Sequence, residues 1–206
     1  MIFDYVIFDF DGTLADDSKL LINKLREISD RELKTKLTDD QIQAYRSLGA
    51  SDLFKKLKLP LHKLPSITLE IQEYMTKIIS EIRLKEGMND VIDKLSNNYK
   101  LGILSSNSHN LIINFLDREG LLDKFEFVEE CSKILGKADC IKKVTKKLKN
   151  DKVIYIGDEI RDIEAMRKAK VEVVSVSWGF NNRDSLVNLN PGRVADTPEQ
   201  LLDLLS

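Results

Sequence analysis

The chain has 206 residues, of which 42% are hydrophobic and 32% are charged. This composition can form and cover a core, which excludes disordered and low-complexity proteins, and the length suits one ordinary domain with a small insert. Lys and Arg total 32 against 34 Asp and Glu, and this near-neutral balance excludes a dedicated binder of nucleic acid or of an anionic membrane, which would carry a basic excess.

The N-terminal segment predicts a strand that ends in a polar turn. Residues 3–8 form a short run rich in β-branched and aromatic side chains, which is typical of a strand. Asp9-Phe10-Asp11-Gly12-Thr13 follows directly, and its glycine favours a turn.

The next block, residues 15–84, shows helical patterns and no convincing strand. Thr38-Asp39-Asp40-Gln41 has the pattern of a helix capping box. Two prolines, Pro60 and Pro65, punctuate the block. We expect helices over residues 20–28, 39–48, 51–57 and 67–82.

After Gly87, strand and helix patterns alternate to the end of the chain. Near-continuous apolar strands that alternate with amphipathic helices are typical of a parallel sheet covered on both faces. We therefore predict an α/β fold, a Rossmann-like parallel sheet with an all-helical insert after its first strand. The expected strands are 100–104, 125–128, 153–156 and 171–176, and the expected helices lie around 88–95, 111–116, 141–148, 160–166 and 198–205.

Three of the expected strands end in polar clusters, at residues 9–13, 105–107 and 157–162. In open parallel sheets, ligands bind beyond the carboxyl ends of the strands. The fold prediction therefore brings these three clusters together into one candidate site.

Two pairs of carboxylates in these clusters indicate a cation site. Asp9 and Asp11 lie two residues apart, and Asp158 and Asp162 lie one helical turn apart. Carboxylate oxygens suit Mg²⁺, which also takes water and substrate phosphate oxygens. Each pair alone is equally consistent with a turn or with ordinary carboxylates at a helix N-terminus.

Three further residues offer groups for a phosphoryl oxygen. Ser105 and Ser106 carry hydroxyls at the end of their strand, and Lys137 precedes a helix where its ammonium could neutralise a carboxylate and a phosphate together. Taken alone, the serines also suit a helix N-cap and the lysine suits the surface.

Together these motifs resemble the haloacid dehalogenase-like (HAD) hydrolases, and among them the phosphoglycolate-phosphatase-like members with a helical cap. Residues 9–14 resemble the first motif of that superfamily, Ser105 the second, Lys137 the third, and Gly157-Asp158 with Asp162 the fourth. The resemblance covers essentially the whole chain. The third motif departs from the pattern because no proline follows Lys137, and Lys133 is a rival for that position.

The resemblance implies a Mg²⁺-dependent phosphoric monoester hydrolase that acts through an aspartyl-phosphate. Asp9 would attack phosphorus and Asp11 would act as acid and base. Mg²⁺ would be held by Asp9, the backbone carbonyl of Asp11, and Asp158, with Asp162 in a supporting role. Ser105, Ser106, Gly12, Thr13 and Lys137 would hold the phosphate.

The resemblance also implies the domain organisation and the partners. Residues 1–14 and 86–206 would form the HAD-like core, and residues 15–85 a cap that closes over the site. In the cap, Arg46 and Ser47 are candidates for substrate contact, although a solvated charge is the simpler interpretation of Arg46. We expect a small phosphorylated substrate, no nucleic acid, no membrane, and a monomer or weak homodimer.

Two alternatives to a phosphatase stay open. One is a sugar phosphomutase of the β-phosphoglucomutase kind. Those relatives carry a histidine soon after the first motif, whereas residues 14–24 contain none, which counts against this alternative. The other is a HAD-like protein that binds a phosphorylated ligand without turnover. The true dehalogenases of the superfamily lack the second aspartate of the first motif. By this resemblance, the presence of Asp11 favours phosphate ester chemistry over carbon–halogen cleavage.

The cysteines and the N-terminus bear on location. Residues 1–10 lack the basic region and cleavage site of a signal peptide, and no apolar run approaches the ~20 residues of a membrane helix. Cys131 and Cys140 are the only cysteines and match neither a disulfide framework nor a CxxC site. We therefore expect a cytoplasmic protein in a reducing compartment.

Overall fold

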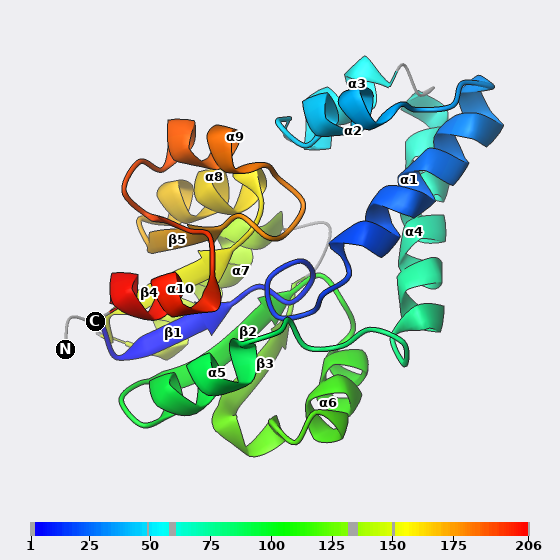
Figure 1. Cartoon of the computed structure of the whole chain (residues 1–206). Helices are drawn as coiled ribbons and strands as arrows, with labels where there is room; N and C mark the ends of the chain where they lie inside the picture. Colours follow the sequence, from blue (N-terminus) through cyan, green and yellow to red (C-terminus); the bar gives the residue numbers. More distant parts are fainter. Residues whose placement is uncertain (1–2, 49, 58–60, 132–135, 150, 206) are drawn as a thin grey trace.

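The structure is a computed structural model that describes residues 3–48, 50–57, 61–131, 136–149 and 151–205. Its centre is a parallel sheet of six strands in the order β3-β2-β1-β4-β5-β6, so the first strand lies in the middle (Figure 1). The strands are β1 (Tyr5–Phe8), β2 (Lys100–Ser105), β3 (Phe125–Glu130), β4 (Val153–Gly157), β5 (Glu172–Val176) and β6 (Val194–Ala195).

Helices cover both faces of this sheet, as alternate side chains of the strands require. Val6 and Phe8 of β1 pack into one apolar cluster, and Tyr5 and Ile7 pack into a second cluster on the opposite face. The first face is covered by α5 (Met88–Ser96), α6 (His109–Arg118) and α10 (Pro198–Leu205), and the second by α7 (Gly136–Lys147), α8 (Ile160–Ala169) and α9 (Arg183–Leu189).

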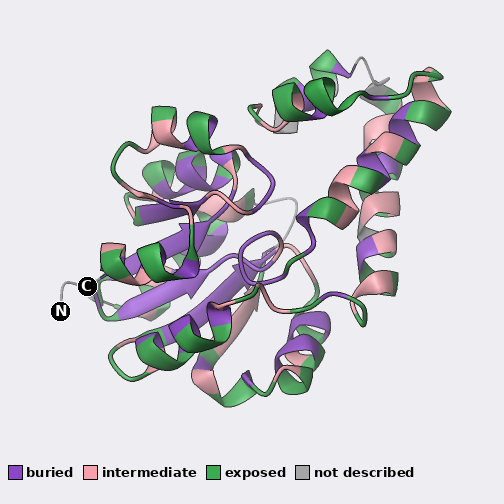
Figure 2. Cartoon of the chain, in the orientation of Figure 1, coloured by how far each residue is buried: buried purple, intermediate pink, exposed green. Residues whose placement is uncertain are grey.

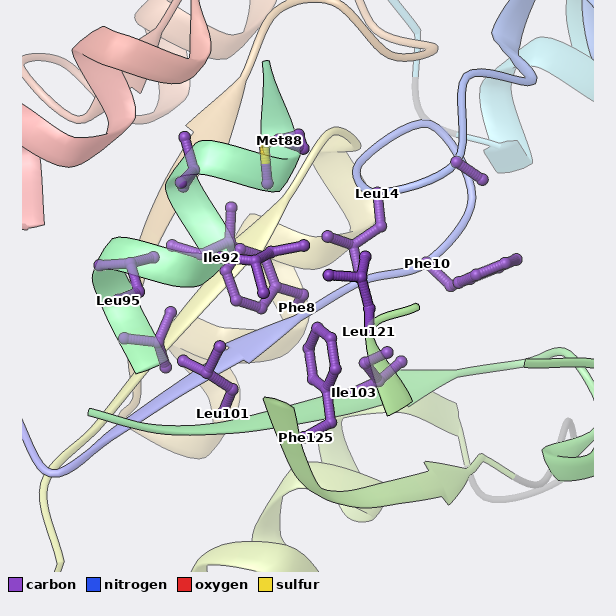
Figure 3. Close-up of a cluster of buried hydrophobic side chains, with 14 of the residues drawn as sticks. Phe8, Phe10, Leu14, Met88, Ile92, Leu95, Leu101, Ile103, Leu121 and Phe125 are labelled. Atoms are coloured by element: carbon purple, nitrogen blue, oxygen red, sulfur yellow. The ribbon is translucent and has the colours of Figure 1, made fainter. Parts of the chain in front are cut away.

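The first cluster is the larger core, and it consists mostly of aliphatic side chains with several phenylalanine rings among them (Figure 3). Phe8 meets Phe125 edge to face with ring centroids 6.3 Å apart, and Phe10 meets Phe115 in the same way at 4.9 Å. Phe8 and Phe10 are fully buried, and burial of a side chain of this size stabilises the fold by about 1.5–3 kcal/mol. This packing fixes β1 at the point where the polar residues 9–13 begin.

The helices after β1 form a cap with a small core of its own. They are α1 (Ser18–Leu33), α2 (Asp39–Tyr45), α3 (Ala50–Lys56) and α4 (Leu64–Ile78), and they stand apart from the sheet in Figures 1 and 2. The predicted capping box is confirmed, because the Thr38 side chain accepts from the backbone N–H of Gln41 and Gln41 bonds back to the backbone of Thr38. The buried apolar residues of this cap core are Leu25, Ile28, Leu37, Ile42, Leu53, Leu57, Ile67 and, from the loop after β5, Phe180.

Two chain segments run side by side between the sheet and the cap. Asp16 donates its backbone N–H to the carbonyl of Arg83 at 2.9 Å, and Lys85 donates to the carbonyl of Leu14 at 2.8 Å. Ala15 and Leu84 form an isolated antiparallel bridge between these bonds. The chain therefore enters and leaves the cap through one short paired neck.

The predicted α/β fold with its helical insert is confirmed, and the structure adds elements that the sequence analysis leaves unassigned. The additions are α9, β6 and two 3-10 turns, η1 (Leu61–Lys63) and η2 (Leu122–Lys124). β6 has two residues, too few for a readable period, and α9 has only seven, starting at an Asn182 side chain that accepts from the Ser185 backbone. Among the described residues, no helix is long and apolar enough to cross a membrane.

Candidate active site

The polar clusters of the sequence meet at the carboxyl edge of β1, β2 and β4. Phe8 lies opposite Ile103 of β2 and Ile156 of β4, so the residues that follow these three strands emerge side by side. The Asp9 backbone N–H continues the ladder by donating to the Ile156 carbonyl at 2.8 Å. The sheet register alone therefore places Asp9 between the Ser105 and Asp158 clusters.

Lys137, at the start of α7, joins two buried carboxylates at this edge. Its Nζ lies 2.6 Å from Asp9 Oδ2 and 2.5 Å from Asp162 Oδ1. Burial raises the pKa of Asp9 to about 7, although the Lys137 ammonium acts in the opposite direction. Burial alone would lower the pKa of Lys137, but Asp162 and Asp9 hold it well above its ordinary value, so the lysine stays charged.

Asp158 sits in a tight backbone cradle after β4. Its Oδ2 accepts from the Phe180 backbone N–H at 2.7 Å, and its Oδ1 accepts from the Thr13 hydroxyl at 3.2 Å. A Cβ at Gly12 or at Gly179 would collide with this carboxylate, and Gly12 also has a positive φ of 66°. Burial, with the nearby Glu159 and Asp162 charges, raises the pKa of Asp158 well above its ordinary value.

The three carboxylates of Asp9, Asp158 and Asp162 form a cluster that fits a divalent cation. Each offers one oxygen, and these oxygens lie within 4.8 Å of one another with all three residues buried. Lys137 contacts Asp9 and Asp162, and the raised pKa values of Asp9 and Asp158 indicate that these buried carboxylates lack enough positive charge to ionise readily. A divalent cation would supply that charge. Both oxygens of Asp162 already accept hydrogen bonds, from Lys137 and from the Glu159 backbone.

Asp11 points to different partners from those of Asp9. Its Oδ1 accepts from the Asn107 side-chain amide at 2.7 Å, and burial raises its pKa. Asp17 lies next to it, with its Oδ1 accepting from the Gly12 backbone at 2.8 Å, and burial and the Asp11 charge raise the pKa of Asp17 to about 10. Asn107 belongs to the second polar cluster and Asp17 lies within the expected cap, but neither contact with this site has a local signal in the sequence.

The second polar cluster forms a turn around the Ser105 hydroxyl. Ser105 is 1% exposed, and its Oγ accepts from the Asn107 backbone N–H at 3.1 Å. Ser106 follows at the wall of the neighbouring pocket. Lys133, the rival for the third-motif lysine, lies outside the described residues, whereas Lys137 reaches Asp9 directly.

A pocket of about 230 Å³ opens beside these groups, between the sheet and the cap. Asp11, Ser106 and Asn107 line it on the sheet side, together with Glu159 and Arg161. Its other lining residues are Leu21, Leu25, Leu53, Thr68, Ile71, Met75 and Phe180. Of the candidate site residues, Asp11 and Ser106 therefore face this space.

Arg46 links the cap to the sheet domain and is absent from the pocket lining. Its guanidinium donates to the Phe180 carbonyl at 2.8 Å and to the Gly179 carbonyl at 3.0 Å. Asn181, in the loop after β5, also bonds to Arg46: its side-chain amide donates to the Arg46 carbonyl at 2.6 Å. The interpretation of Arg46 as a solvated charge is thus wrong. Ser47 is exposed and bonds its own helix, at the Ala44 carbonyl.

The two cysteines form a disulfide between the end of β3 and α7, which corrects the expectation of unpaired thiols. Their Cα atoms are 5.6 Å apart across nine residues of sequence. The Cys131 backbone N–H also donates to the Ser105 carbonyl at 2.7 Å. The spacing alone gave no indication because the approach depends on how α7 packs against the sheet.

Comparisons with known proteins agree with this geometry. The model of the haloacid dehalogenase-like hydrolase family matches residues 6–176. The chain is 30% identical over 204 residues to a phosphoglycolate phosphatase of Synechococcus elongatus, covering 98% of this chain and 96% of that protein. It is 25% identical over 208 residues to the pyrophosphatase PpaX of Listeria welshimeri, covering 97% and 95%.

Solved structures show the same fold. A haloacid dehalogenase-like hydrolase from Streptococcus pneumoniae superposes with a TM-score of 0.79 at 22% identity and covers 99% of both chains. A predicted phosphatase from Clostridium acetobutylicum also reaches 0.79, at 19% identity, over 100% of this chain and 99% of that one.

Proposed function

Because the chain belongs to the haloacid dehalogenase-like hydrolases, we propose that it is a Mg²⁺-dependent phosphatase that hydrolyses a small phosphorylated metabolite through an aspartyl-phosphate. The observation that carries the proposal is the buried constellation of Lys137 bonded to Asp9 and Asp162 beside Asp158. It combines a nucleophile, a fixed positive charge and a cation site at one strand end. Phosphoryl transfer needs little beyond in-line positioning and charge neutralisation.

Asp9 is the proposed nucleophile. One carboxylate oxygen accepts from the Phe10 backbone N–H at 2.8 Å and the other from Lys137, which fixes its orientation toward an incoming phosphoryl group. Its attack forms an acyl-phosphate bond and breaks the bond between phosphorus and the leaving oxygen. Lys137 then neutralises charge that develops on the transferring oxygens.

Asp11 is the proposed acid and base. It lines the pocket from which the leaving group departs, and the Asn107 amide holds its carboxyl in place. It gives its proton to the leaving oxygen and then takes a proton from the water that cleaves the acyl-phosphate. Ser105 and Ser106, with the backbone of Gly12 and Thr13, are proposed to hold phosphate oxygens.

The fit of the acidic cluster supports Mg²⁺ as the cofactor. Asp9, Asp158 and the backbone carbonyl of Asp11 would hold it, while Asp162 keeps Lys137 and the start of α8 in place. When bound, Mg²⁺ offsets the negative charge of the carboxylates and of the phosphoryl group. With the repulsion between them reduced, the Asp9 carboxylate and the phosphoryl group can approach each other.

The proposed domains follow the paired neck. Residues 1–14 and 86–206 form the catalytic core and residues 15–85 form the cap. The bonds between Asp16 and Arg83 and between Lys85 and Leu14 support a division at these positions. Closure of such a cap would exclude water from the leaving-group pocket.

The test is trapping of the covalent intermediate. The protein with Mg²⁺ is mixed with a ³²P-labelled aryl phosphate and quenched in acid within milliseconds. We expect labelled protein that loses its label with hydroxylamine, which cleaves acyl-phosphates, together with steady release of phosphate. Asp9→Asn should carry no label. Unlabelled wild-type protein and no phosphate release would overturn the proposal.

A further inference from the structure

The pocket beside Asp11 has two chemically different walls. The sheet side is polar and includes Asp11, Asn107 and Arg161. Among the described residues, the cap contributes no charged side chain to the lining. Its lining residues are the five apolar side chains of Leu21, Leu25, Leu53, Ile71 and Met75, and the hydroxyl of Thr68.

Two described cations of the cap that lie close in sequence or space to lining residues, Lys24 and Arg46, bond to other groups. Lys24 precedes the lining residue Leu25 but bonds Glu27 and Glu70, at 2.9 Å each. Arg46 donates to the carbonyls of the loop after β5. Among the described residues, the cap therefore lines the pocket with mainly apolar side chains, while Lys24 and Arg46 are paired with other groups.

The cation that the sheet side offers in this lining is also paired. Arg161 lies 2.5 Å from the carboxylate of Glu159, which lines the same pocket. Glu159 already offsets the charge of this guanidinium, so a leaving group with a carboxylate or a second phosphate would gain less from Arg161 than from an unpaired cation. The same group would lose water against leucine, isoleucine and methionine, which is strongly unfavourable for an unpaired charge.

We propose that the substrate is a phosphomonoester whose leaving group is uncharged and largely apolar, an alkyl or aryl alcohol bound against the cap wall. This inference rests on the proposed phosphatase function. A pocket of about 230 Å³ holds roughly eight groups of the size of a water molecule, at about 30 Å³ each, so a leaving group of about six to eight non-hydrogen atoms fits. Asp9 displaces the alcohol from phosphorus, and the leaving oxygen takes the Asp11 proton. Water then cleaves the acyl-phosphate, so the products are the alcohol and inorganic phosphate.

The first test compares isosteric substrates. Isobutyl phosphate matches phosphoglycolate in shape, with two methyl groups in place of the two carboxylate oxygens. We expect kcat/KM for isobutyl phosphate to exceed that for phosphoglycolate and for pyrophosphate at least tenfold. In a series of n-alkyl phosphates, kcat/KM should rise by roughly two- to fourfold per methylene and level off near six carbons. Equal values for the isosteres, or a preference for phosphoglycolate, would overturn the inference and leave the phosphatase proposal standing.

A charge placed on the cap wall should reverse this preference. Thr68 is exposed on α4 and lines the pocket, so Thr68→Lys adds a cation without disturbing a buried contact. We expect it to lower the ratio of kcat/KM for isobutyl phosphate to that for phosphoglycolate at least fivefold. Leu69→Lys is the matched control, because Leu69 is 54% exposed on the same helix and does not line the pocket. An unchanged ratio in Thr68→Lys, or an equal change in both variants, would contradict the assignment of this wall.

Binding without turnover separates the two proposals. Non-hydrolysable n-alkylphosphonates with Mg²⁺ should bind with Kd falling by roughly two- to fourfold per methylene in calorimetric titrations. If this trend holds while no phosphomonoester is hydrolysed, the apolar pocket stands and the phosphatase function fails. Affinities that do not depend on chain length would reject the apolar pocket whether or not the protein turns over substrate.

Discussion

The two sides of the pocket are held by different forces. On the sheet side, each charged group has specific partners, such as Asp9 with Lys137 and Asp158 with the Phe180 backbone. The cap is held by apolar packing inside and by exposed ion pairs such as Arg31 with Glu70 outside. Directional bonds in a buried site fix geometry to fractions of an ångström, whereas apolar packing tolerates exchange of similar side chains. We therefore expect the chemistry to take place at the sheet edge and the choice of substrate to depend on the cap.

The largest effect should come from the sheet edge, at Asp9. Asp9→Asn keeps the shape of the side chain but removes the nucleophile, so we expect kcat to fall at least about a thousandfold while the fold is retained. Phosphate release and a melting curve measure both. Activity within tenfold of the parent would contradict the assignment of Asp9.

Metal removal should have a comparably large effect and should separate Asp158 from Asp162. EDTA should abolish activity, Mg²⁺ should restore it, and Ca²⁺ should bind without turnover because its looser coordination misplaces the reacting groups. Asp158→Ala should raise the Mg²⁺ concentration for half-maximal activity at least tenfold.

Asp162→Asn is the comparison variant for this metal prediction. Asp162 holds the Lys137 ammonium and the backbone at the start of α8, so we expect it to act by positioning Lys137, and we expect the Mg²⁺ requirement to change less than threefold. Asp162→Asn should instead lower the free energy of unfolding by about 1–3 kcal/mol, because Lys137 loses a buried charged partner. An equal shift in Mg²⁺ requirement for both variants would show that Asp162 is a ligand.

A smaller effect is expected at Asn107. Asn107→Ala removes the amide that orients Asp11, so kcat should fall roughly tenfold to a hundredfold for an alkyl phosphate. An aryl phosphate needs less protonation of its leaving group and should lose clearly less. Single-turnover rates for the two substrates test this. Equal losses of rate for both would show that Asn107 does not act through protonation of the leaving group.

At the junction of the two regions, Arg46 should affect the cap more than the chemistry. Arg46→Ala removes two hydrogen bonds to the loop after β5 and should lower stability by about 1–3 kcal/mol. We expect KM to rise severalfold with kcat changed less than threefold. Arg46→Lys should recover little, because an ammonium cannot span two carbonyls as the planar guanidinium does. A fall in kcat alone would contradict this division of roles.

The smallest effect on activity is expected from the disulfide. Closure of a loop of this length by Cys131 and Cys140 should contribute about 2–3 kcal/mol of stability in the chain-entropy model. Cys140→Ser should lower the melting temperature and leave kcat within about threefold. A thiol reductant should lower the melting temperature of the parent equally and that of the variant not at all. A parent that does not respond to the reductant would show that the thiols are unpaired.

The sequence determined the architecture of the catalytic sheet because its signals are local. The continuous apolar strands, the helical periods between them and the polar turn at Asp9 each lie within a few residues, and the parallel-sheet rule then groups the strand ends. The contact of Lys137 with Asp9 was anticipated only through the resemblance to the HAD motifs, because Lys137 taken alone suits the surface. The helical character of the insert was equally readable, down to the capping box at Thr38.

Only the tertiary structure decided how the site is supported and how the pocket is lined. Asn107 meets Asp11 across 96 residues, and Arg46 meets the Phe180 carbonyl across 134. These pairings depend on the distance between elements after packing, and neither residue carries a periodic or motif signal of its own. The same holds for the apolar cap wall, because Leu21 and Ile71 read equally well as core residues until the packing of α1 and α4 shows which face they leave open to the pocket.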